Sequence, residues 1–407
     1  MNYLEYIKIE NEHTLKPKSH KIQDIFKDWW DIFLKKHNML NIRNVVKKEV
    51  SKFVGCGLKD NGFAFYECEK CTNYLYVPFT CKSRFCPSCG VNSCLKRSEE
   101  MPSRCLDVQH RHIVFTISED LRIYFLKDRS LLNELFDAAS YTLTSWFKQQ
   151  STLESFTPGI IATLHTFGRD LKWNPHIHIL ATEGAMGNKT PWKTFNHFPY
   201  EMLRKRFMTK LLVNLSKHIH SIEFKKLKNI LYKENCKGFY VYARKDYNSN
   251  IKITLGYITR YTSRPAMAES RILDYDGEYV TFFYSRHEDN KRVEEKVHVF
   301  ELIKKLIIHI PEECFNMVRY YGIYAMKKIK SSHLKRIKDK LTKPLKWLDK
   351  LILHFKCNPL KCSCGNTLKF QFVVEKASQN FFQLLYPNRL WLRYFNFNIY
   401  FLNYQVN

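Results

Sequence analysis

The sequence has no run of apolar residues approaching the roughly 18 that a membrane-spanning helix needs, which argues against an integral membrane protein. Its first residues, MNYLEYIKIENEH, lack the basic segment and apolar core of a secretory signal, so export is not expected. The chain has no internal repeat and no long linker. We therefore expect a cytoplasmic protein, and its 407 residues suffice for two or three globular domains.

Acidic residues are also in short supply, because 66 Lys and Arg stand against 39 Asp and Glu, a formal net charge of +27. Such an excess favours a polyanionic partner, since Lys and Arg release counterions when they bind a phosphate backbone. The composition therefore predicts a nucleic-acid partner, with a merely basic soluble protein as the alternative.

Cysteine, by contrast, is abundant, and eight of the 13 cysteines fall between Cys56 and Cys105. In a large chain without a secretory signal, this density indicates metal ligation in a reducing cytosol more than a disulfide framework. The segment thus predicts an N-terminal metal-binding module.

Two Cys-x2-Cys pairs stand out in CEKCTNYLYVPFTCKSRFCPSCG, namely Cys68 with Cys71 and Cys86 with Cys89. Each pair folds two thiolates onto one metal ion, and two pairs complete the tetrahedral set that zinc prefers. We expect a structural zinc site from these four cysteines, with Cys81 as an alternative ligand that could take the place of one of them. A redox-active pair is the weaker alternative.

A zinc ion held by four thiolates has no open coordination position, so it is expected to stabilise the fold of a small domain and not to catalyse a reaction. We expect the surface of this domain to contact DNA. Lys82 and Arg84 lie between the pairs and are candidate phosphate contacts.

Other cysteines are expected to stay without metal. Cys56 and Cys94 are interpreted as packed or free thiols. A C-terminal cluster of Cys357, Cys362 and Cys364 lacks an obvious fourth ligand, so the unliganded state is favoured there.

The remaining chain mixes the two kinds of periodicity without a regular βαβ repeat. Helical spacing occurs at 22–37, 131–150, 200–227 and 253–264, and strand-like runs at 110–118, 159–168, 176–184, 238–244 and 270–286. Asp276-Gly277 between two alternating runs is a hairpin signal. These patterns predict an α+β fold with a mainly antiparallel sheet, followed from about residue 290 by a basic helical region and an aromatic tail.

His-x-His occurs three times, at His110/His112, His176/His178 and His218/His220. Residues two apart share one face of a strand but diverge by about 200° on a helix, so the third pair, in a helical pattern, is set aside. The first pair has the charged Arg111 between its members. The second pair, in NPHIHIL, has apolar neighbours and is the candidate metal site, with core or surface histidines as the alternative.

His165 is the candidate third ligand, because it lies on the preceding strand and hairpin pairing would set it beside His176 and His178. A register slip of one residue would turn it to the opposite face. Downstream, Tyr257 and Tyr261 lie four apart, about one helical turn. By spacing alone they are either a packing pair or a pair of nucleophiles.

Together these segments resemble the rolling-circle transposases of bacterial insertion sequences, the two-tyrosine branch of the His-hydrophobic-His endonucleases. The resemblance covers nearly all of the chain up to about residue 370. It rests on CEKC…VPFTCKSRFCPSCG, HRHIVFTI, LHTFGRDLKWNPHIHIL, YITRYTSRPAMAESRI and FFYSRHED, in that order.

The resemblance implies that His176 and His178 ligate a catalytic Mg²⁺ or Mn²⁺ and that Tyr257 and Tyr261 attack single-stranded DNA at the element ends. Arg260 and Arg264, beside the tyrosines, are candidate phosphate contacts. The protein would then be bacterial, cytoplasmic and associated with the nucleoid.

Three consecutive domains are expected: a helix with the zinc module over 1–106, an endonuclease-like domain over 107–290, and a basic helical region over 291–407. The C-terminal CNPLKCSCG looks like a degraded form of a knuckle found in such transposases, and the aromatic tail has no recognised counterpart. Two alternatives remain: a zinc-containing DNA-binding protein or transposase remnant without catalysis, and a replication initiator or relaxase.

Overall fold

The structure is a computed structural model that describes residues 22–71, 73–195, 197–243, 265–286, 289–325, 358, 360–376 and 397–400. The chain forms two compact units, each assembled from separate stretches of sequence. The first comprises Met1–Gly90, Ala268–Val280 and Leu345–Asn407, and the second comprises Val91–Met267 and Thr281–Pro344.

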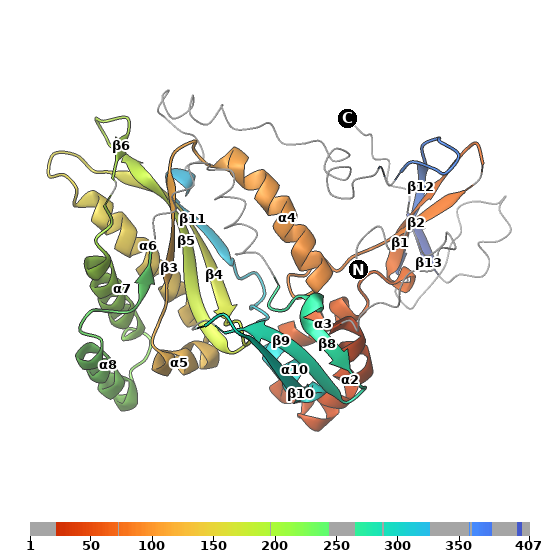
Figure 1. The fold of residues 1–407 in the computed structure, drawn as a ribbon, viewed down its shortest axis with the longest axis horizontal. Helices are drawn as coiled ribbons and strands as arrows, with labels where there is room; N and C mark the ends of the chain where they lie inside the picture. Colours follow the sequence, from red (N-terminus) through yellow and green to blue (C-terminus); the bar gives the residue numbers. More distant parts are fainter. Residues whose placement is uncertain are drawn as a thin grey trace. The chain divides into compact units, whose positions relative to one another are not determined.

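An antiparallel sheet forms the centre of the second unit (Figure 1). Its strands lie in the order β11-β4-β5-β3-β7, and β6 pairs with β5. Their bounds are β3 His110–Phe115, β4 Thr157–Phe167, β5 Trp173–Met186, β6 Lys193–Thr194, β7 Val241–Tyr242 and β11 Val318–Gly322.

Alternation along the strands gives this sheet two different faces. Ile177 and Ile179 of β5 are fully buried in the main core, together with Leu164 of β4 and Phe115 of β3. Because successive residues point to opposite faces, His176 and His178, which alternate with these isoleucines, lie on the other face. The isoleucines and histidines of NPHIHIL therefore serve different purposes.

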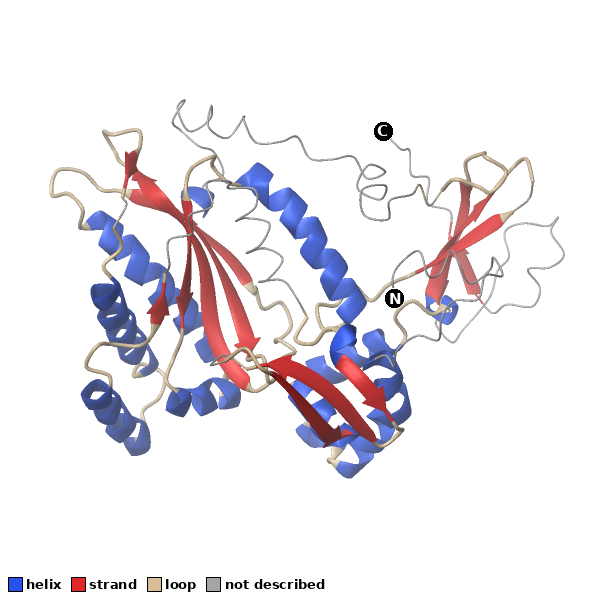
Figure 2. Cartoon of the chain, viewed as in Figure 1, coloured by secondary structure: helices blue, strands red, loops and turns tan. Residues whose placement is uncertain are grey.

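Helices supply the rest of the core on the isoleucine face. Leu135 and Phe147 of α6 and Phe207 of α7 are fully buried there. Figure 2 shows these helices gathered on one side of the sheet. Among the described residues, the helices that contribute to the second unit are α4 Pro87–Arg104, which begins in the first unit, α5 Arg122–Lys127, α6 Leu132–Lys148, α7 Tyr200–Leu215, α8 Ile222–Glu234 and α10 Val299–Ile307.

The first unit contains a helical pair and a small sheet. Phe26 of α2 meets Phe53 of α3 edge to face, with ring centroids 5.6 Å apart. The sheet has the order β13-β12-β1-β2 and all its pairs are antiparallel. The bounds are α2 Ile22–Lys36, α3 Asn44–Val54, β1 Gly62–Glu67, β2 Tyr74–Pro78, β12 Lys369–Lys376 and β13 Phe397–Tyr400.

The Asp276-Gly277 turn joins two strands, as its sequence predicts. Asp276 Oδ1 accepts from the backbone N–H of Glu278 and Tyr279, and Gly277 has φ +102°, a conformation that favours glycine. The three-stranded sheet here has the order β10-β9-β8. Its strands are β8 Ile272–Tyr275, β9 Tyr279–Ser285 and β10 Arg292–His298.

Short 3-10 turns also occur among the described residues, at Met39–Asn41, Lys59–Asn61, Glu119–Leu121, Arg129–Leu131, Glu269–Arg271 and Ile323–Ala325.

The α+β class with antiparallel sheets is confirmed. The densest basic run of the expected helical C-terminal region, residues 326–347, lies outside the described residues, and the described part of 291–407 contains α10 and the strands β10, β11, β12 and β13. The compact units are discontinuous, unlike the three consecutive domains expected. The reason is strand pairing: β11 joins β4, and β12 joins β1, from far along the chain.

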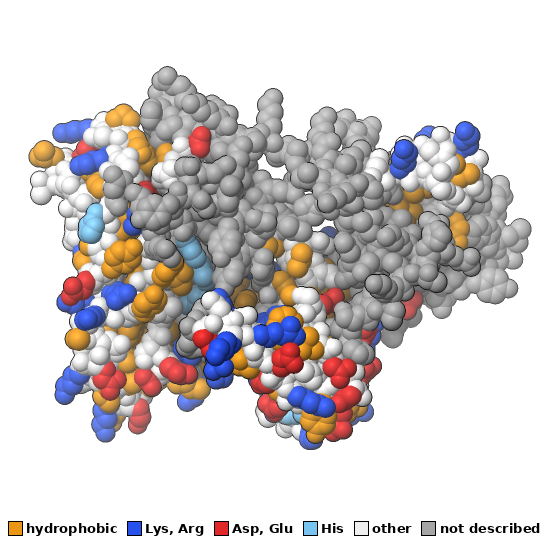
Figure 3. Space-filling view, viewed as in Figure 1, with side chains coloured by type: hydrophobic (Ala, Val, Ile, Leu, Met, Phe, Trp, Pro, Cys, Tyr) orange, Lys and Arg blue, Asp and Glu red, His pale blue; other side chains and the backbone are white. Residues whose placement is uncertain are grey.

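Side chains of both charges lie on the described surface. On the face shown in Figure 3, Lys and Arg are interspersed with Asp and Glu and do not form one basic face. Within the described residues, no helix combines the length and the apolar character that crossing a membrane requires.

Candidate metal centre

The β4–β5 hairpin brings three histidines together. Antiparallel pairing sets His165 of β4 directly opposite His176 of β5, and Thr163 opposite His178. Directly opposed residues share a face, so His165 joins the two histidines of β5. The predicted juxtaposition is present in the structure, although the ligand role of these side chains stays a prediction.

The three imidazoles converge closely enough to share one ion. One nitrogen of each ring lies within 4.8 Å of the others. The ring centroids of His165 and His178 are 4.4 Å apart, and those of His176 and His178 are 4.9 Å apart. Nitrogens bound at about 2.1 Å to one ion lie at most about 4.2 Å apart, so small side-chain shifts suffice for coordination.

A hydrogen bond to a carbonyl oxygen fixes which nitrogen of His176 faces the centre, and a contact with a second imidazole involves Nδ1 of His178. His176 Nδ1 lies 2.7 Å from the carbonyl oxygen of Asn174, which only accepts, so Nδ1 carries the proton and Nε2 keeps its lone pair. His178 Nδ1 lies 2.9 Å from His112 Nε2. If His178 donates in this contact, its Nε2 is also available as a ligand, the usual tautomer of a metal-bound histidine.

Burial favours the neutral form of His178, the form that binds cations. His165 and His178 are buried and His176 is half-buried. The pKa of His178 lies well below its ordinary value, first because burial penalises the imidazolium and then because His165, His176 and His112 lie nearby. Neutral imidazole is the species that ligates metal, so the electrostatics and the geometry agree.

His112 is the residue at this centre that the sequence patterns did not select. In the sequence, Arg111 lies between His110 and His112, and its charge disfavours this pair as a metal site. In the structure, Arg111 points to the opposite face, where its Nε lies 2.8 Å from Glu183 Oε1 in a buried ion pair. Alternation along β3 was the signal that would have shown His112 to be separate from that charge.

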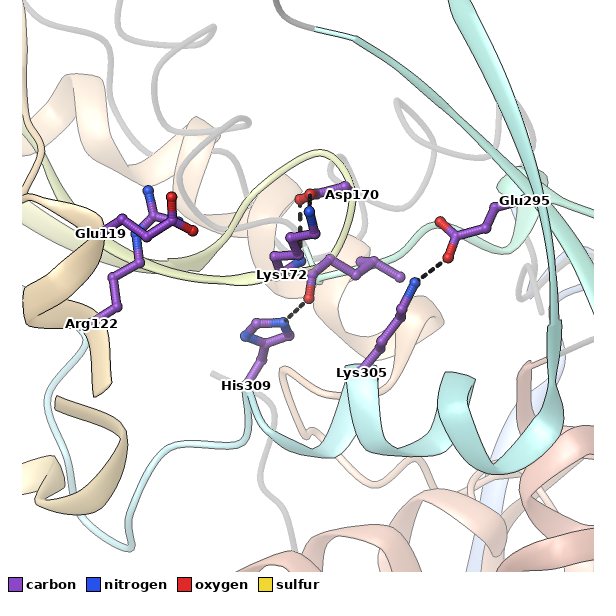
Figure 4. A network of polar contacts seen from close by, with 8 residues as sticks. Glu119, Arg122, Asp170, Lys172, Glu295, Lys305 and His309 are labelled. Carbon is purple, nitrogen blue, oxygen red and sulfur yellow. Dashed lines mark hydrogen bonds and ion pairs between the residues drawn. The ribbon is translucent and has the colours of Figure 1, made fainter. Parts of the chain in front are cut away.

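A buried histidine after α10 supports the turn that sets the hairpin register. His309 Nε2 donates to the carbonyl oxygen of Leu171 at 3.0 Å, and its Nδ1 accepts from Thr166 Oγ1 at 3.1 Å. Leu171 has φ +65°, a conformation that non-glycine residues rarely adopt without support. Figure 4 shows His309 reaching the turn that also carries Asp170 and Lys172.

The third His-x-His pair lies apart from this centre, as expected, but for a different reason. His218 and His220 are exposed in the loop between α7 and α8, not on a helix. His218 Nε2 lies 3.1 Å from Glu134 Oε1.

The cysteines form two four-sulfur groups, and their membership differs from the expected set. Cys86 and Cys89 meet Cys56 and Cys81, whereas Cys68 and Cys71 meet Cys362 and Cys364. The predicted grouping of Cys68, Cys71, Cys86 and Cys89 is therefore wrong, although each of the four lies in such a group. Cys86 immediately precedes α4 and Cys89 lies in its first turn. Cys68 follows β1, whose partner strand β12 brings the C-terminal cysteines close to it.

Distances in the first group fit zinc. Cys89 Sγ lies 3.6 Å from both Cys56 Sγ and Cys81 Sγ, and Cys86 Sγ lies 3.8 Å from Cys56 Sγ. Four sulfurs at about 2.3 Å from a tetrahedral zinc are about 3.8 Å apart. The same crowding lowers the pKa of Cys89 and raises that of Cys86, in each case chiefly through hydrogen bonds to Cys56 and Cys81. A bound cation would allow all four to ionise.

The remaining predicted site residues differ in whether the structure describes them. Lys82 is exposed and Arg84 half-buried in the loop between Cys81 and Cys86, and Lys82 has φ +54°. Cys94 is buried and belongs to neither sulfur group. Cys357 and the proposed catalytic segment, with Tyr257, Tyr261, Arg260 and Arg264, lie outside the described residues.

Two family models match the chain over the regions that contain these centres. One, described as "Transposase zinc-binding domain", matches residues 25–117, and the other, described as "Putative transposase", matches residues 159–332. The chain belongs to this family of transposases with an N-terminal zinc-binding domain.

Curated relatives agree with this assignment. The transposase is 28% identical over 298 residues to the transposase for insertion sequence element IS801 of Pseudomonas savastanoi pv. phaseolicola, which covers 70% of this chain and 71% of the relative. It is 25% identical over 320 residues to "Putative transposase y4qJ" of Sinorhizobium fredii, covering 74% and 79%. No solved structure matches the transposase significantly.

Proposed function

We propose that this transposase cleaves and rejoins single-stranded DNA by tyrosine attack in rolling-circle transposition, with His165, His176 and His178 holding a catalytic Mg²⁺ or Mn²⁺. The observation that carries the proposal is the convergence of three imidazoles within 4.8 Å on one face of an antiparallel sheet. Neutral nitrogen ligands on one side of an ion leave its other positions open to phosphate oxygens.

The bound cation would polarise the scissile phosphate and stabilise the charge that develops on its oxygens. The histidines themselves orient that cation. The hydrogen bond from His176 to Asn174 O fixes one ring, and the contact between His178 and His112 fixes another. Rings held in this way need little rearrangement when the ion and the phosphate arrive.

The proposed chemistry is a transesterification. A hydroxyl oxygen of Tyr257 or Tyr261 attacks the phosphorus, and the bond from phosphorus to the 3′ oxygen breaks. The products are a 5′-phosphotyrosine and a free 3′-hydroxyl, which receives a proton. Because the new ester keeps the energy of the old one, a 3′-hydroxyl can later attack it and rejoin the strand without ATP. A second tyrosine allows two strands to be held at once.

The partner in this proposal is single-stranded DNA at the element ends, handled in the bacterial cytoplasm at the nucleoid. Lys82 extends from the loop of the first sulfur group and, with Arg84, is a proposed phosphate contact. Arg260 and Arg264 are proposed to contact the phosphates near the nucleophiles. The net charge of +27 supports a polyanionic substrate.

A covalent-adduct experiment tests the nucleophiles. Wild-type protein with labelled single-stranded DNA carrying element ends and Mn²⁺ is expected to form an adduct that survives a denaturing gel. The Tyr257→Phe, Tyr261→Phe variant keeps both rings but loses both hydroxyls, so no adduct is expected. An adduct in that variant would refute the assignment of the tyrosines as nucleophiles. If the wild-type protein forms no adduct, the proposed enzymatic activity is refuted.

His112 is predicted to orient His178. Replacement by alanine removes the partner of His178 Nδ1, so we expect Mn²⁺ affinity to fall by about tenfold to a hundredfold. The loss of free Mn²⁺ signal in electron paramagnetic resonance measures this affinity.

The His112→Gln variant is the matched control, because its side-chain oxygen can accept the same hydrogen bond. We expect it to recover most of the affinity. Equal affinities in wild type and His112→Ala would show that His178 does not depend on this contact.

A further inference from the structure

The second sulfur group is built from opposite ends of the chain. Cys68 Sγ lies 3.5 Å from Cys364 Sγ, and Cys71 Sγ lies 3.4 Å from Cys362 Sγ, across sequence separations of 296 and 291 residues. The family match for zinc binding ends at residue 117 and therefore contains only half of this group.

Each half of the group lies on a hydrogen-bonded turn. On the N-terminal side, Cys68 N–H donates to Asn73 O at 2.8 Å. On the C-terminal side, Cys362 N–H donates to Asn366 O at 2.7 Å, and Gly365 with φ +90° closes the turn. This left-handed glycine turns the chain sharply after Cys364, so a Cys-x-Cys pair can direct both sulfurs to one point.

The strands below the turns hold them face to face. β1 and β12 pair from Gly62 with Glu375 to Glu67 with Lys369, so β1 ends and β12 begins beside the cysteines. Asn73 Nδ2 also donates to Ser363 Oγ at 2.9 Å, which ties one turn to the other.

The surroundings suit a structural ion. Cys68 and Cys362 are buried with Leu75 and Leu368 in an apolar cluster, with Tyr66 and Val77 packed beside it. Sulfurs 3.4–3.5 Å apart are close to the spacing of about 3.8 Å around tetrahedral zinc and far from the roughly 2.05 Å of a disulfide. Cys71 is half-buried and Cys364 is exposed, so two of the four sulfurs are buried, and four thiolates this close together need a cation to neutralise them.

We infer that Cys68, Cys71, Cys362 and Cys364 bind a second structural zinc ion, independent of the first, that fastens the C-terminal strand β12 to the N-terminal strand β1. The site is a zinc ribbon divided between the two ends of the chain. Its metal stabilises the β1–β12 pairing across the whole intervening sequence, so the N-terminal sheet depends on residues near position 362. This inference holds whether or not the protein cleaves DNA.

Zinc stoichiometry in the full-length chain tests the inference. Protein purified under reducing conditions is expected to hold close to two zinc ions per chain, measured by mass spectrometry of the metal. The Cys362→Ser, Cys364→Ser variant should lose about one, and the Cys56→Ser, Cys81→Ser variant should lose the other. The Cys236→Ser, Cys314→Ser variant changes two exposed thiols outside both groups and should keep both ions.

A second variant addresses folding. Cys364→His replaces one thiolate by an imidazole, which zinc also accepts, so both ions should be retained while the thiolate-to-metal absorption of the cobalt-substituted protein decreases by about one ligand's share. Two zinc ions in the Cys362→Ser, Cys364→Ser variant would overturn the second site. No zinc at all in that variant would overturn the independence of the two sites, and a wild-type value near one would overturn the inference as a whole.

Discussion

Replacing His176 and His178 by alanine is expected to lower the rate of covalent adduct formation on single-stranded DNA by about a thousandfold. A metal ion that stabilises charge on a phosphoryl oxygen contributes several kcal/mol to the transition state, and about 4 kcal/mol corresponds to this factor. Two of the three converging imidazoles would be gone, so the ion would no longer be held. The rate is measured by quenched time points on a denaturing gel at fixed Mn²⁺.

His218 and His220 offer a matched control within the same chain. They have the same spacing but are exposed in the loop between α7 and α8. Their double alanine variant should keep the wild-type rate within about twofold. Zinc content and affinity for single-stranded DNA should remain at the wild-type level in both variants. Equal losses in the two variants, or no loss in either, would contradict the assignment of the metal centre to His176 and His178.

Acidification is expected to destabilise the second unit, because two of its histidines are buried in neutral form. Burial lowers the pKa of His110 and of His309 from 6.5 to about 4. Above pH 6.5 both residues are neutral in the folded and unfolded chains. As the pH falls from 6.5 to about 4, the unfolded chain binds protons that the folded chain does not, so the free energy of unfolding decreases.

The size of the effect follows from the pKa difference. Each histidine contributes about 3 kcal/mol of stability above pH 6.5, and this contribution is lost progressively down to about pH 4. Denaturant midpoints near neutral pH and near pH 4.5 measure the loss.

The His309→Gln variant distinguishes the loss of stability caused by protonation of His309 from the loss caused by acid release of zinc. Glutamine does not titrate, and its amide can still donate to Leu171 O and accept from Thr166 Oγ1. Zinc loss affects wild type and variant alike. The variant should therefore lose about 2 kcal/mol less than wild type between pH 7 and pH 4.5, once its own value at neutral pH is subtracted. An identical pH dependence in the two proteins would contradict the role given to His309.

Local patterns predicted several elements because their causes are local. Apolar spacing gave the helix over 22–37, which is observed at Ile22–Lys36, and Asp276-Gly277 gave the observed turn before Tyr279. The alternation in NPHIHIL separated a core face from a histidine face for the same reason. The short connection between the runs at 159–168 and 176–184 predicted a hairpin or adjacent strands, but the register that sets His165 opposite His176 is seen only in the structure.

Patterns failed where the answer depends on which distant segments meet. The sulfur atoms of Cys68 and Cys71 lie beside those of cysteines almost 300 positions later in the chain. No spacing rule links cysteines so far apart in sequence. The compact Cys-x2-Cys pairs suggested a single local site instead. His112 was likewise missed because its value depends on β3 lying beside β5, which sets Val114 opposite His178.

The functional groups available to this protein can be identified from the linear sequence: a pair of histidines on an alternating strand, enough closely spaced cysteines to bind metal, and a large excess of basic residues. Which of these groups lie close enough together to bind one ion depends on the tertiary structure. Alternation and short turns are properties of neighbouring residues, so they can be read along the chain. Strand order and the meeting of β1 with β12 are set by burial and backbone pairing over the whole fold, and only the folded chain shows them.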